Sequence, residues 1–384
     1  MKKYRSNPIV ITVVAGQAAS LVNFRLPLLK KLLSIGFEVH VCAPKIFDDV
    51  STSGILKENG IILHEVSFER AGINPFKDIK AAYDLYRTFV QIKPEVVLSY
   101  TIKPVIFGTV AATLAMVPKR IAMITGLGYA FTRKARGKRY LVRAVVCSLY
   151  RTALKKAHHI VFQNPDDLAE FRALGLVKPG ARVSIVNGSG VDLDFFKPTI
   201  IPPISPRIRF LLIARMLGDK GVREFVAAAK QIEIAYPNVR FELVGDCDDN
   251  PDSISFDTLS SWNTAKNITW HGAQSDVRPF LNACHIYVLP SYREGTPRSV
   301  LEAMAVGRPI ITTDAPGCRE TVTPGLNGFL VPPGDAGALK NAMQHFLDHP
   351  DLIQEMGKES LSIARLKYDV NIVNEQVLSA IIPL

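Results

Sequence analysis

The sequence has few cysteines and no long apolar segment. Its five cysteines are scattered among 384 residues, and none forms a C-x-x-C pair. This pattern argues against a disulfide framework and a structural zinc site, and it favours a reducing compartment. No apolar stretch approaches the roughly 20 residues that a membrane-spanning helix needs. No tandem repeat or low-complexity tract is visible either, so we expect an ordinary globular protein.

Positive charge is in excess, with 46 Lys and Arg against 35 Asp and Glu. Such a balance is typical of proteins that bind nucleic acid, anionic lipid or phosphorylated substrates. Residues 133–156 contain nine cations and no carboxylate, with apolar residues interspersed at roughly helical spacing. We interpret this segment as a basic amphipathic helix on an anionic membrane surface. A solvated helix face is the alternative. The cations are Arg133, Lys134, Arg136, Lys138, Arg139, Arg143, Arg151, Lys155 and Lys156.

Short β-branched runs alternate with longer amphipathic ones along the whole chain, which predicts strands alternating with helices. The first set of expected strands lies at 9–14, 38–43, 96–100, 120–125, 159–163 and 182–186, with a helix over 24–35 that ends at Gly36. The second set lies at 209–214, 239–244, 268–270, 286–289, 309–313 and 328–331. The apolar run at 9–14 superficially suggests a signal peptide, but it is short and runs directly into a loop. Alternation of this kind gives parallel sheets with helices on both faces.

A proline-rich stretch separates the two sets of strands. Residues 197–207 contain four prolines, which cannot continue a helix or a central strand. We therefore predict an α/β protein with two doubly wound, Rossmann-like domains facing a cleft, at 1–197 and 208–355, with a linker at 198–207. A final helix over about 356–380 has no strand after it, and we expect residues 356–384 to cross back to the first domain.

The strongest motif is a nine-residue segment that begins at Glu294 and ends at Glu302. It follows the expected strand at 286–289 and leads into an apolar helix. Ligands of doubly wound sheets bind at strand carboxyl ends, where Glu294 would lie. The start of the helix would direct the N–H groups near Ser299 and Val300 at a phosphate, and Glu302 would accept hydrogen bonds from a ribose diol. A helix with a capping glutamate is the alternative.

The second motif consists of two cations after the expected strand at 209–214. Arg215 follows the strand, and Lys220 stands five residues further on, before a helix. Two cations at one strand end can neutralise a diphosphate, and each charge-assisted hydrogen bond contributes about 1.5–3 kcal/mol. A solvated basic turn is the alternative.

These two motifs resemble those of the retaining GT-B glycosyltransferases of family 4. The resemblance covers nearly the whole chain and is dense over 186–335. It also includes Asn187-Gly188, Gly190-Val191-Asp192, Gly245-Asp246, His271-Gly272, Ala303-Met304-Ala305, Gly317, Glu320 and Asn327-Gly328. The first half is similar to bacterial enzymes that build surface polysaccharides and lipid-linked oligosaccharides, in particular to N-acetylgalactosaminyltransferases. The segments that carry this similarity are Asn23-Phe24-Arg25, Ile73-Asn74-Pro75-Phe76, Lys103-Pro104 and Gly126-Leu127-Gly128.

The resemblance implies a role for each site residue. Arg215 and Lys220 would bind the donor diphosphate and stabilise it as the leaving group. Glu302 would hold the ribose, and Glu294 would contact the donor sugar or the developing positive charge. Gly16, in the loop after the first strand, would let the acceptor and a phosphate approach the backbone. Together with Arg298, Ser299 and Val300, these residues form the predicted donor-binding set.

One position departs from the family pattern. Many members carry a histidine in the loop after the fourth strand, where this chain has Thr101 and Lys103. We predict that Lys103, or Thr101, takes over a catalytic role there; a surface lysine is the alternative. The acidic cluster of Asp246, Asp248 and Asp249 is not needed to hold a metal, because the cations already offset phosphate charge. We therefore expect no obligatory metal or cofactor.

The resulting hypothesis is a glycosyltransferase that moves a sugar, best taken as an N-acetylhexosamine, from a UDP-sugar to a lipid-linked or polysaccharide acceptor. We expect it in the cytoplasm, peripheral on the inner face of the cell membrane. A nucleotide-sugar epimerase of the same GT-B shape is one alternative. A nucleic-acid-binding protein is the other, and it is disfavoured because aromatic residues are not interleaved with the cations.

Overall fold

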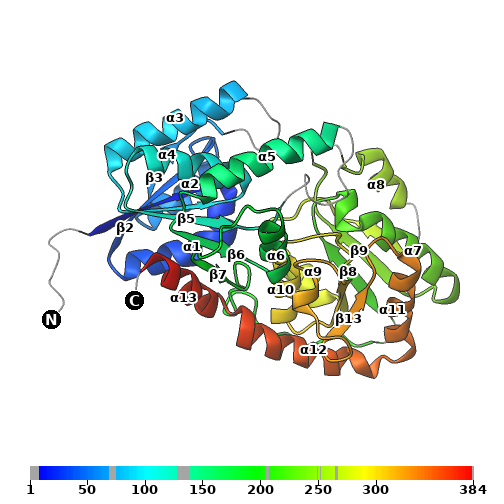
Figure 1. Ribbon diagram of the computed structural model, residues 1–384. Helices are drawn as coiled ribbons and strands as arrows, with labels where there is room; N and C mark the ends of the chain where they lie inside the picture. The colour runs from blue at the N-terminus through cyan, green and yellow to red at the C-terminus, as the bar shows by residue number, and fades with distance from the viewer. Residues whose placement is uncertain are drawn as a thin grey trace. The chain divides into compact units, whose positions relative to one another are not determined.

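The computed structural model describes residues 8–68, 75–127, 138–204, 207–248, 250, 252–263 and 267–382. The chain forms two compact units. The first contains Met1–Ser189 and Asn374–Leu384, and the second contains Gly190–Val373. Each unit has a parallel sheet with helices on both faces (Figure 1).

The first sheet has strand order β3-β2-β1-β4-β5-β6-β7. Its central strands are almost fully buried, as their β-branched runs predict. One face is covered by α1 (Ala19–Ser34) and by α13 (Val370–Ile381), and the other by α3 (Pro75–Ile92), α4 (Thr109–Leu114) and α5 (Lys138–Leu154). The strands are β1 (Ile9–Val14), β2 (Phe37–Ala43), β3 (Ile62–Glu65), β4 (Val96–Tyr100), β5 (Lys119–Ile124), β6 (His159–Phe162) and β7 (Val183–Ile185). Two shorter helices are α2 (Val50–Glu58) and α6 (Pro165–Ala173).

The second sheet has strand order β10-β9-β8-β11-β12-β13. Helices α7 (Val222–Ala235) and α11 (Ala336–Asp348) pack on one face, and α9 (Arg278–Ala283) and α10 (Arg298–Ala305) pack on the other. The strands are β8 (Arg209–Ile213), β9 (Arg240–Val244), β10 (Ile268–Trp270), β11 (Ile286–Leu289), β12 (Ile310–Thr313) and β13 (Gly328–Val331). Two further helices are α8 (Phe256–Trp262) and α12 (Asp351–Ile363).

Both sheets contain a topological switch point, the place where the strand order reverses direction. It lies between β1 and β4 in the first sheet and between β8 and β11 in the second. Ligands of doubly wound folds bind outside the carboxyl ends of the strands at such points. The predicted fold of two doubly wound α/β units is confirmed, and each unit offers one such position for a ligand.

The predicted single helix over 356–380 is wrong. Helix α12 ends at Ile363, a π-helical turn covers Ala364–Tyr368, and α13 begins at Val370. Backbone hydrogen bonds with Val191 replace the helical ones here, because the Val191 N–H donates to the Tyr368 carbonyl and the Val370 N–H donates to the Val191 carbonyl. The tertiary contact therefore breaks the helix. The helix expected over 24–35 also begins earlier, at Ala19, and strand β3 is not among the predicted strands.

Helix α13 brings the end of the described chain to the first unit. Val377 and Leu378 are buried in the same apolar cluster as Leu28 and Leu29 of α1. The Lys119 ammonium donates to the Ile381 carbonyl over 2.7 Å. The division into units falls after Ser189, and the chain returns at Asn374, so the proline-rich stretch 198–204 belongs to the second unit. Among the described helices, none combines the length and apolar character that crossing a membrane requires.

Candidate functional site

The switch point of the second sheet holds a close ion pair between Lys220 and Glu294. The Lys220 Nζ atom lies 2.6 Å from Glu294 Oε1, and the side chains are 16% and 15% exposed. Lys220 follows β8 and Glu294 follows β11, the two strands that flank the switch point. The structure thus places two of the predicted site residues in direct contact, 74 residues apart in sequence.

Two glycines allow the loops of this pair to approach the neighbouring backbone. Gly221 has a φ of +73°, and a Cβ atom there would lie 2.1 Å from the Pro290 carbonyl oxygen. Gly317 has a φ of +79°, and its Cβ would lie 2.2 Å from the Glu294 carbonyl oxygen. Only glycine tolerates both the backbone conformation and the contact. The two glycines therefore let the loops that carry Lys220 and Glu294 pack closely against the neighbouring backbone.

Arg215 also points to a carboxylate. Its Nη1 atom lies 2.7 Å from Asp248 Oδ2, and the guanidinium side chain is half exposed. An exposed cation that is already held in place can exchange part of its hydration for a phosphate oxygen at low entropic cost. The Asp248 carboxylate is thus engaged in an ion pair with Arg215. Within the described residues, no group of three or more His, Cys, Asp or Glu side chains is placed to hold a metal ion.

The carboxylate of Glu302 pairs with the first residue of its own helix. Arg298 Nε donates to Glu302 Oε1 over 3.0 Å, one turn along α10. Burial raises the pKa of Glu302, and the Arg298 guanidinium opposes this change. The pair leaves the Glu302 side chain mostly enclosed, at 13% exposure.

The start of α10 offers fewer backbone donors than the sequence predicts. Helix α10 begins at Arg298, and Pro297 caps it without a side-chain hydrogen bond. The Val300 N–H donates to the Pro297 carbonyl over 3.1 Å, so it is already engaged. No hydrogen bond from the described part of the chain occupies the Ser299 N–H. Of the two predicted amides, the Ser299 N–H is the better placed to donate a hydrogen bond to a phosphate oxygen.

Asp219 lies beside Lys220 and is a candidate site residue that the sequence analysis did not include. Its Oδ1 atom is buried, and no described residue donates a hydrogen bond to it. Burial raises the pKa of Asp219; Lys220 lowers it and Glu294 raises it. A buried carboxylate oxygen without a donor is costly and suggests that a ligand group completes the site. Its position directly before Lys220 is a signal that could have drawn attention to it.

In the first unit, Lys103 forms an ion pair with Asp78. The Lys103 Nζ atom lies 2.7 Å from Asp78 Oδ1, and both side chains are mostly buried. Lys103 follows β4, at the switch point of the first sheet, and Asp78 lies in the first turn of α3. The Lys103 side chain is therefore mostly buried and held by the Asp78 carboxylate, in contrast to the surface lysine of the alternative. Nothing in the sequence pairs these two residues.

Gly16 lies beside the same loop. A Cβ atom on Gly16 would lie 2.9 Å from the Thr101 Oγ1 atom. Thr101 has a φ of +70°, a left-handed conformation that β-branched residues rarely adopt. Such strain persists only where the surroundings demand it, and it clusters at functional sites. The β1 and β4 loops are thus closely packed, and Gly16 is required by this approach.

A comparison with known proteins decides the family. An N,N'-diacetylbacillosaminyl-diphospho-undecaprenol alpha-1,3-N-acetylgalactosaminyltransferase of Campylobacter jejuni is 32% identical over 371 residues, with 94% of this chain and 95% of the relative covered. This chain belongs to the family 4-like glycosyltransferases. The family model described as "Glycosyl transferase 4-like" matches residues 14–164, and the model "Glycosyl transferases group 1" matches residues 207–349.

One further relative agrees with this family, and one solved structure agrees with the fold. A UDP-Gal:alpha-D-GlcNAc-diphosphoundecaprenol alpha-1,3-galactosyltransferase of Escherichia coli is 28% identical, over 72% of each chain. The solved structure of sucrose-phosphate synthase from Thermosynechococcus elongatus superposes with a TM-score of 0.80 at 18% identity, over 97% of this chain and 98% of that one. The predicted GT-B fold and glycosyltransferase activity are confirmed, and the epimerase alternative finds no support.

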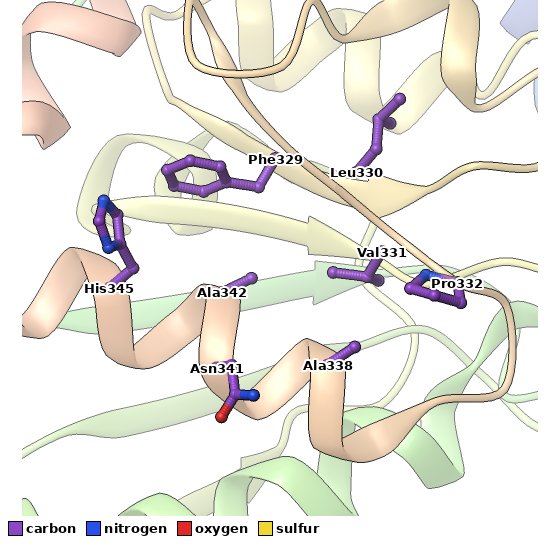
Figure 2. Close-up of a pocket in the computed structure, with 8 residues that line it drawn as sticks. All are labelled: Phe329, Leu330, Val331, Pro332, Ala338, Asn341, Ala342 and His345. Carbon is purple, nitrogen blue, oxygen red and sulfur yellow. The ribbon is translucent and has the colours of Figure 1, made fainter.

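A pocket of about 380 Å³ in this glycosyltransferase lies away from these residues, between β13 and α11 (Figure 2). Phe329 and His345 lie at one end of it, and Val331 and Pro332 lie at the other. Its lining contains no Lys, Arg, Asp or Glu side chain. A diphosphate needs cations or clustered amides, so this pocket does not suit the nucleotide.

Proposed function

We propose that this glycosyltransferase transfers an N-acetylhexosamine from a UDP-sugar to a lipid-linked or polysaccharide acceptor, with retention of configuration. The Lys220–Glu294 pair at the switch point of the second sheet is the observation that carries this proposal. The name of the Campylobacter relative supports N-acetylgalactosaminyl transfer and a diphospho-undecaprenol substrate. The name of the Escherichia relative supports a UDP-linked donor.

In the proposed reaction, the bond between the anomeric carbon and the diphosphate oxygen breaks, and a bond to the acceptor oxygen forms. Lys220 and Arg215 stabilise the negative charge that develops on the departing diphosphate. Glu294 faces the sugar, where positive charge develops in an oxocarbenium-like transition state. The departing phosphate takes the proton of the acceptor hydroxyl. The products are the nucleoside diphosphate and the lengthened glycan.

The contacts of the site support this division of roles. Lys220 is held by Glu294 before the donor arrives, so its ammonium needs little reorganisation to meet a phosphate oxygen. Glu302 is held by Arg298 at the side of the site where the ribose would lie. In the first unit, we assign Lys103 and Gly16 to the phosphate-bearing acceptor, in place of the catalytic and donor-binding roles expected of them from the sequence. We further propose that the enzyme works in the cytoplasm, on the inner face of the cell membrane, where a lipid-linked acceptor is held.

A panel of UDP- and GDP-sugars tests the donor assignment. We expect one UDP-N-acetylhexosamine to bind and to be hydrolysed slowly in the absence of acceptor. Lys220→Ala should lower turnover far more than it weakens donor binding, because Lys220 acts mainly on the departing charge. Glu294→Ala should also lose turnover. Lys230→Ala, an exposed lysine on α7, is the matched control. Binding of none of these sugars, or an equal loss of binding and turnover in Lys220→Ala, would contradict the proposal.

A further inference from the structure

The outward face of α3 is both apolar and cationic. Phe76 and Ile79 are 85% and 65% exposed, and Tyr83 is exposed one turn further along. Lys80 and Arg87 are exposed on the same helix. The remaining charged residue with an exposed side chain on this helix is Lys77. Both carboxylates of α3 have partners: Asp78 forms an ion pair with Lys103, and Asp84 accepts a hydrogen bond from the Ser67 hydroxyl. The exposed face thus presents cations without an exposed carboxylate.

The described side chains of helix α5 present an apolar stripe. Leu141, Val145 and Leu149 are exposed and follow one another at intervals of four residues, along one side of the helix. Two of its cations are turned to neighbours: Arg143 pairs with Glu170 of α6, and Arg151 donates to the Leu174 carbonyl. Lys155 and Lys156, just after the helix, are exposed, so the basic character expected of the segment 133–156 stays a prediction. Residues 133–137 and the side chains of 138–140 lie outside the described part of the segment.

The two helices lie on the same face of the first sheet. The buried sides of α3 and α5 cover neighbouring strands, and α4 contacts both helices (Figure 1). Isolated exposed apolar residues are ordinary, but six large ones on two helices that both contact α4, over one face of one sheet, are costly to leave in water. We name Phe76, Ile79, Tyr83, Leu141, Val145 and Leu149 the α3–α5 surface.

This surface is linked directly to the candidate acceptor site. Asp78 lies in the first turn of α3 between Phe76 and Ile79, and it points inward to Lys103 at the switch point. The same helical turn thus carries apolar side chains outward and holds the site lysine inward. A contact on the outer side of this turn would lie one helix diameter, about 10 Å, from the lysine.

We propose that the α3–α5 surface docks the enzyme on an anionic lipid bilayer. Its apolar side chains enter the boundary between headgroups and acyl chains, and Lys80 and Arg87 contact the anionic headgroups. The combination favours a bilayer over another partner, because a broad apolar face fringed by cations and lacking exposed carboxylates complements anionic lipid. The proposed function explains only why such docking would be useful: it would hold Lys103 near a lipid-linked acceptor. The bilayer contact itself is measured without any substrate.

Sedimentation with vesicles tests the proposal on the full chain. The vesicles contain phosphatidylcholine alone or phosphatidylcholine mixed with phosphatidylglycerol. Lys80→Ala with Arg87→Ala should weaken binding to the mixed vesicles about 25-fold, at about fivefold for each cation. Phe76→Ser with Ile79→Ser, and Leu141→Ser with Val145→Ser, should each weaken it about tenfold or more. The matched control is Lys230→Ala with Ile234→Ser on α7, since Ile234 is 86% exposed and Lys230 is exposed too.

The outcomes separate this surface from the proposed function. Selective loss in the α3 and α5 variants supports the surface, whether or not a lipid-linked acceptor is used. Failure of the unaltered enzyme to bind mixed vesicles, or an equal loss in the α7 control, overturns it. If the enzyme then still uses a lipid-linked acceptor in detergent, the proposed function stands alone. Transfer to a water-soluble acceptor analogue should be unchanged in all α3–α5 variants, because none of these residues belongs to the candidate site.

Discussion

The Lys220 ammonium and the Glu294 carboxylate form an ion pair 2.6 Å long, and each side chain is about five-sixths enclosed by protein. Each residue comes from a different strand end, so the pair joins the two sides of the switch point. The contact orders the site before a donor binds. It also makes each charge dependent on the other for its solvation, since an enclosed charge without a partner is costly.

A double-mutant cycle measures this dependence. Lys220→Met and Glu294→Gln should each lower the free energy of unfolding, and the double variant should lose less than the sum of the two. We expect a coupling free energy of about 1–3 kcal/mol, because each single variant leaves one enclosed partner uncompensated. Thermal unfolding of the four proteins without donor gives the value. Additive losses would show that solvent already screens the pair.

The stability of the enzyme should depend on pH through Glu302. Burial raises the pKa of Glu302 in the folded state, so folded protein keeps this proton to a higher pH than the unfolded chain does. The contribution of Glu302 to stability is therefore complete below the ordinary glutamate pKa and is lost as the pH rises towards the folded value. Glu302→Gln removes this loss. As the pH rises through that interval, the melting temperature of Glu302→Gln should increase relative to that of the unaltered enzyme.

Melting curves at a series of pH values check this prediction. Glu355→Gln on α12 is the control, because Glu355 is exposed and the exchange also removes one carboxylate. A parallel shift in both variants would assign the pH dependence to net charge rather than to the buried glutamate.

Changes to the Lys103–Asp78 pair should weaken acceptor binding and leave the affinity for the donor unchanged. Lys103→Ala should raise the acceptor KM about tenfold or more, the effect of losing one charge-assisted hydrogen bond to a phosphate. Asp78→Asn should have a smaller effect in the same direction, because it loosens the lysine without removing it. Asp84→Asn, on the same helix, is the matched control. Steady-state kinetics for the acceptor and calorimetry for the donor separate the two substrates; an unchanged acceptor KM would contradict the assignment.

Gly16 and Gly54 should respond in opposite ways to alanine. A Cβ on Gly16 meets Thr101 Oγ1 at 2.9 Å, whereas a Cβ on Gly54, inside α2, meets nothing within 4 Å. Gly16→Ala should cost about 1–3 kcal/mol of unfolding free energy, as overpacking usually does. Gly54→Ala should gain about 0.4–1 kcal/mol, because it restricts the unfolded chain. Thr101→Gly should partly restore Gly16→Ala, since it removes both the hydroxyl and the left-handed strain. Failure of this rescue would mean that the crowding arises from other atoms.

The sequence predicts the strands well and the contacts between loops poorly. Strands β1, β4, β10, β11 and β13 have the predicted bounds, because a buried strand needs only a local run of apolar residues. The partners of the site cations are different. Asp78 is 25 residues from Lys103, and Asp248 is 33 residues from Arg215. No local pattern joins such residues, and only the folded sheet brings them together.

The break between α12 and α13 shows the same limit. Residues 364–369 contain no glycine or proline, so nothing local stops the helix. The cause is Gly190, whose missing Cβ allows the chain to come close to Val370 and exchange backbone hydrogen bonds there. The predicted helix fails at a tertiary contact that the periodicity of the sequence does not encode.

The return of α13 to the first unit has a consequence for biosynthesis. Val377, Leu378 and Ile381 complete the apolar cluster around α1, yet the ribosome adds them only after the whole second unit has been made. One apolar flank of the nascent first unit therefore stays uncovered while almost two hundred residues are translated, about 10–40 s at elongation rates of about 5–20 residues per second. The first unit therefore cannot complete its folding before the second unit has been synthesised. Chaperones that bind exposed apolar surface would bind to this flank of the nascent chain.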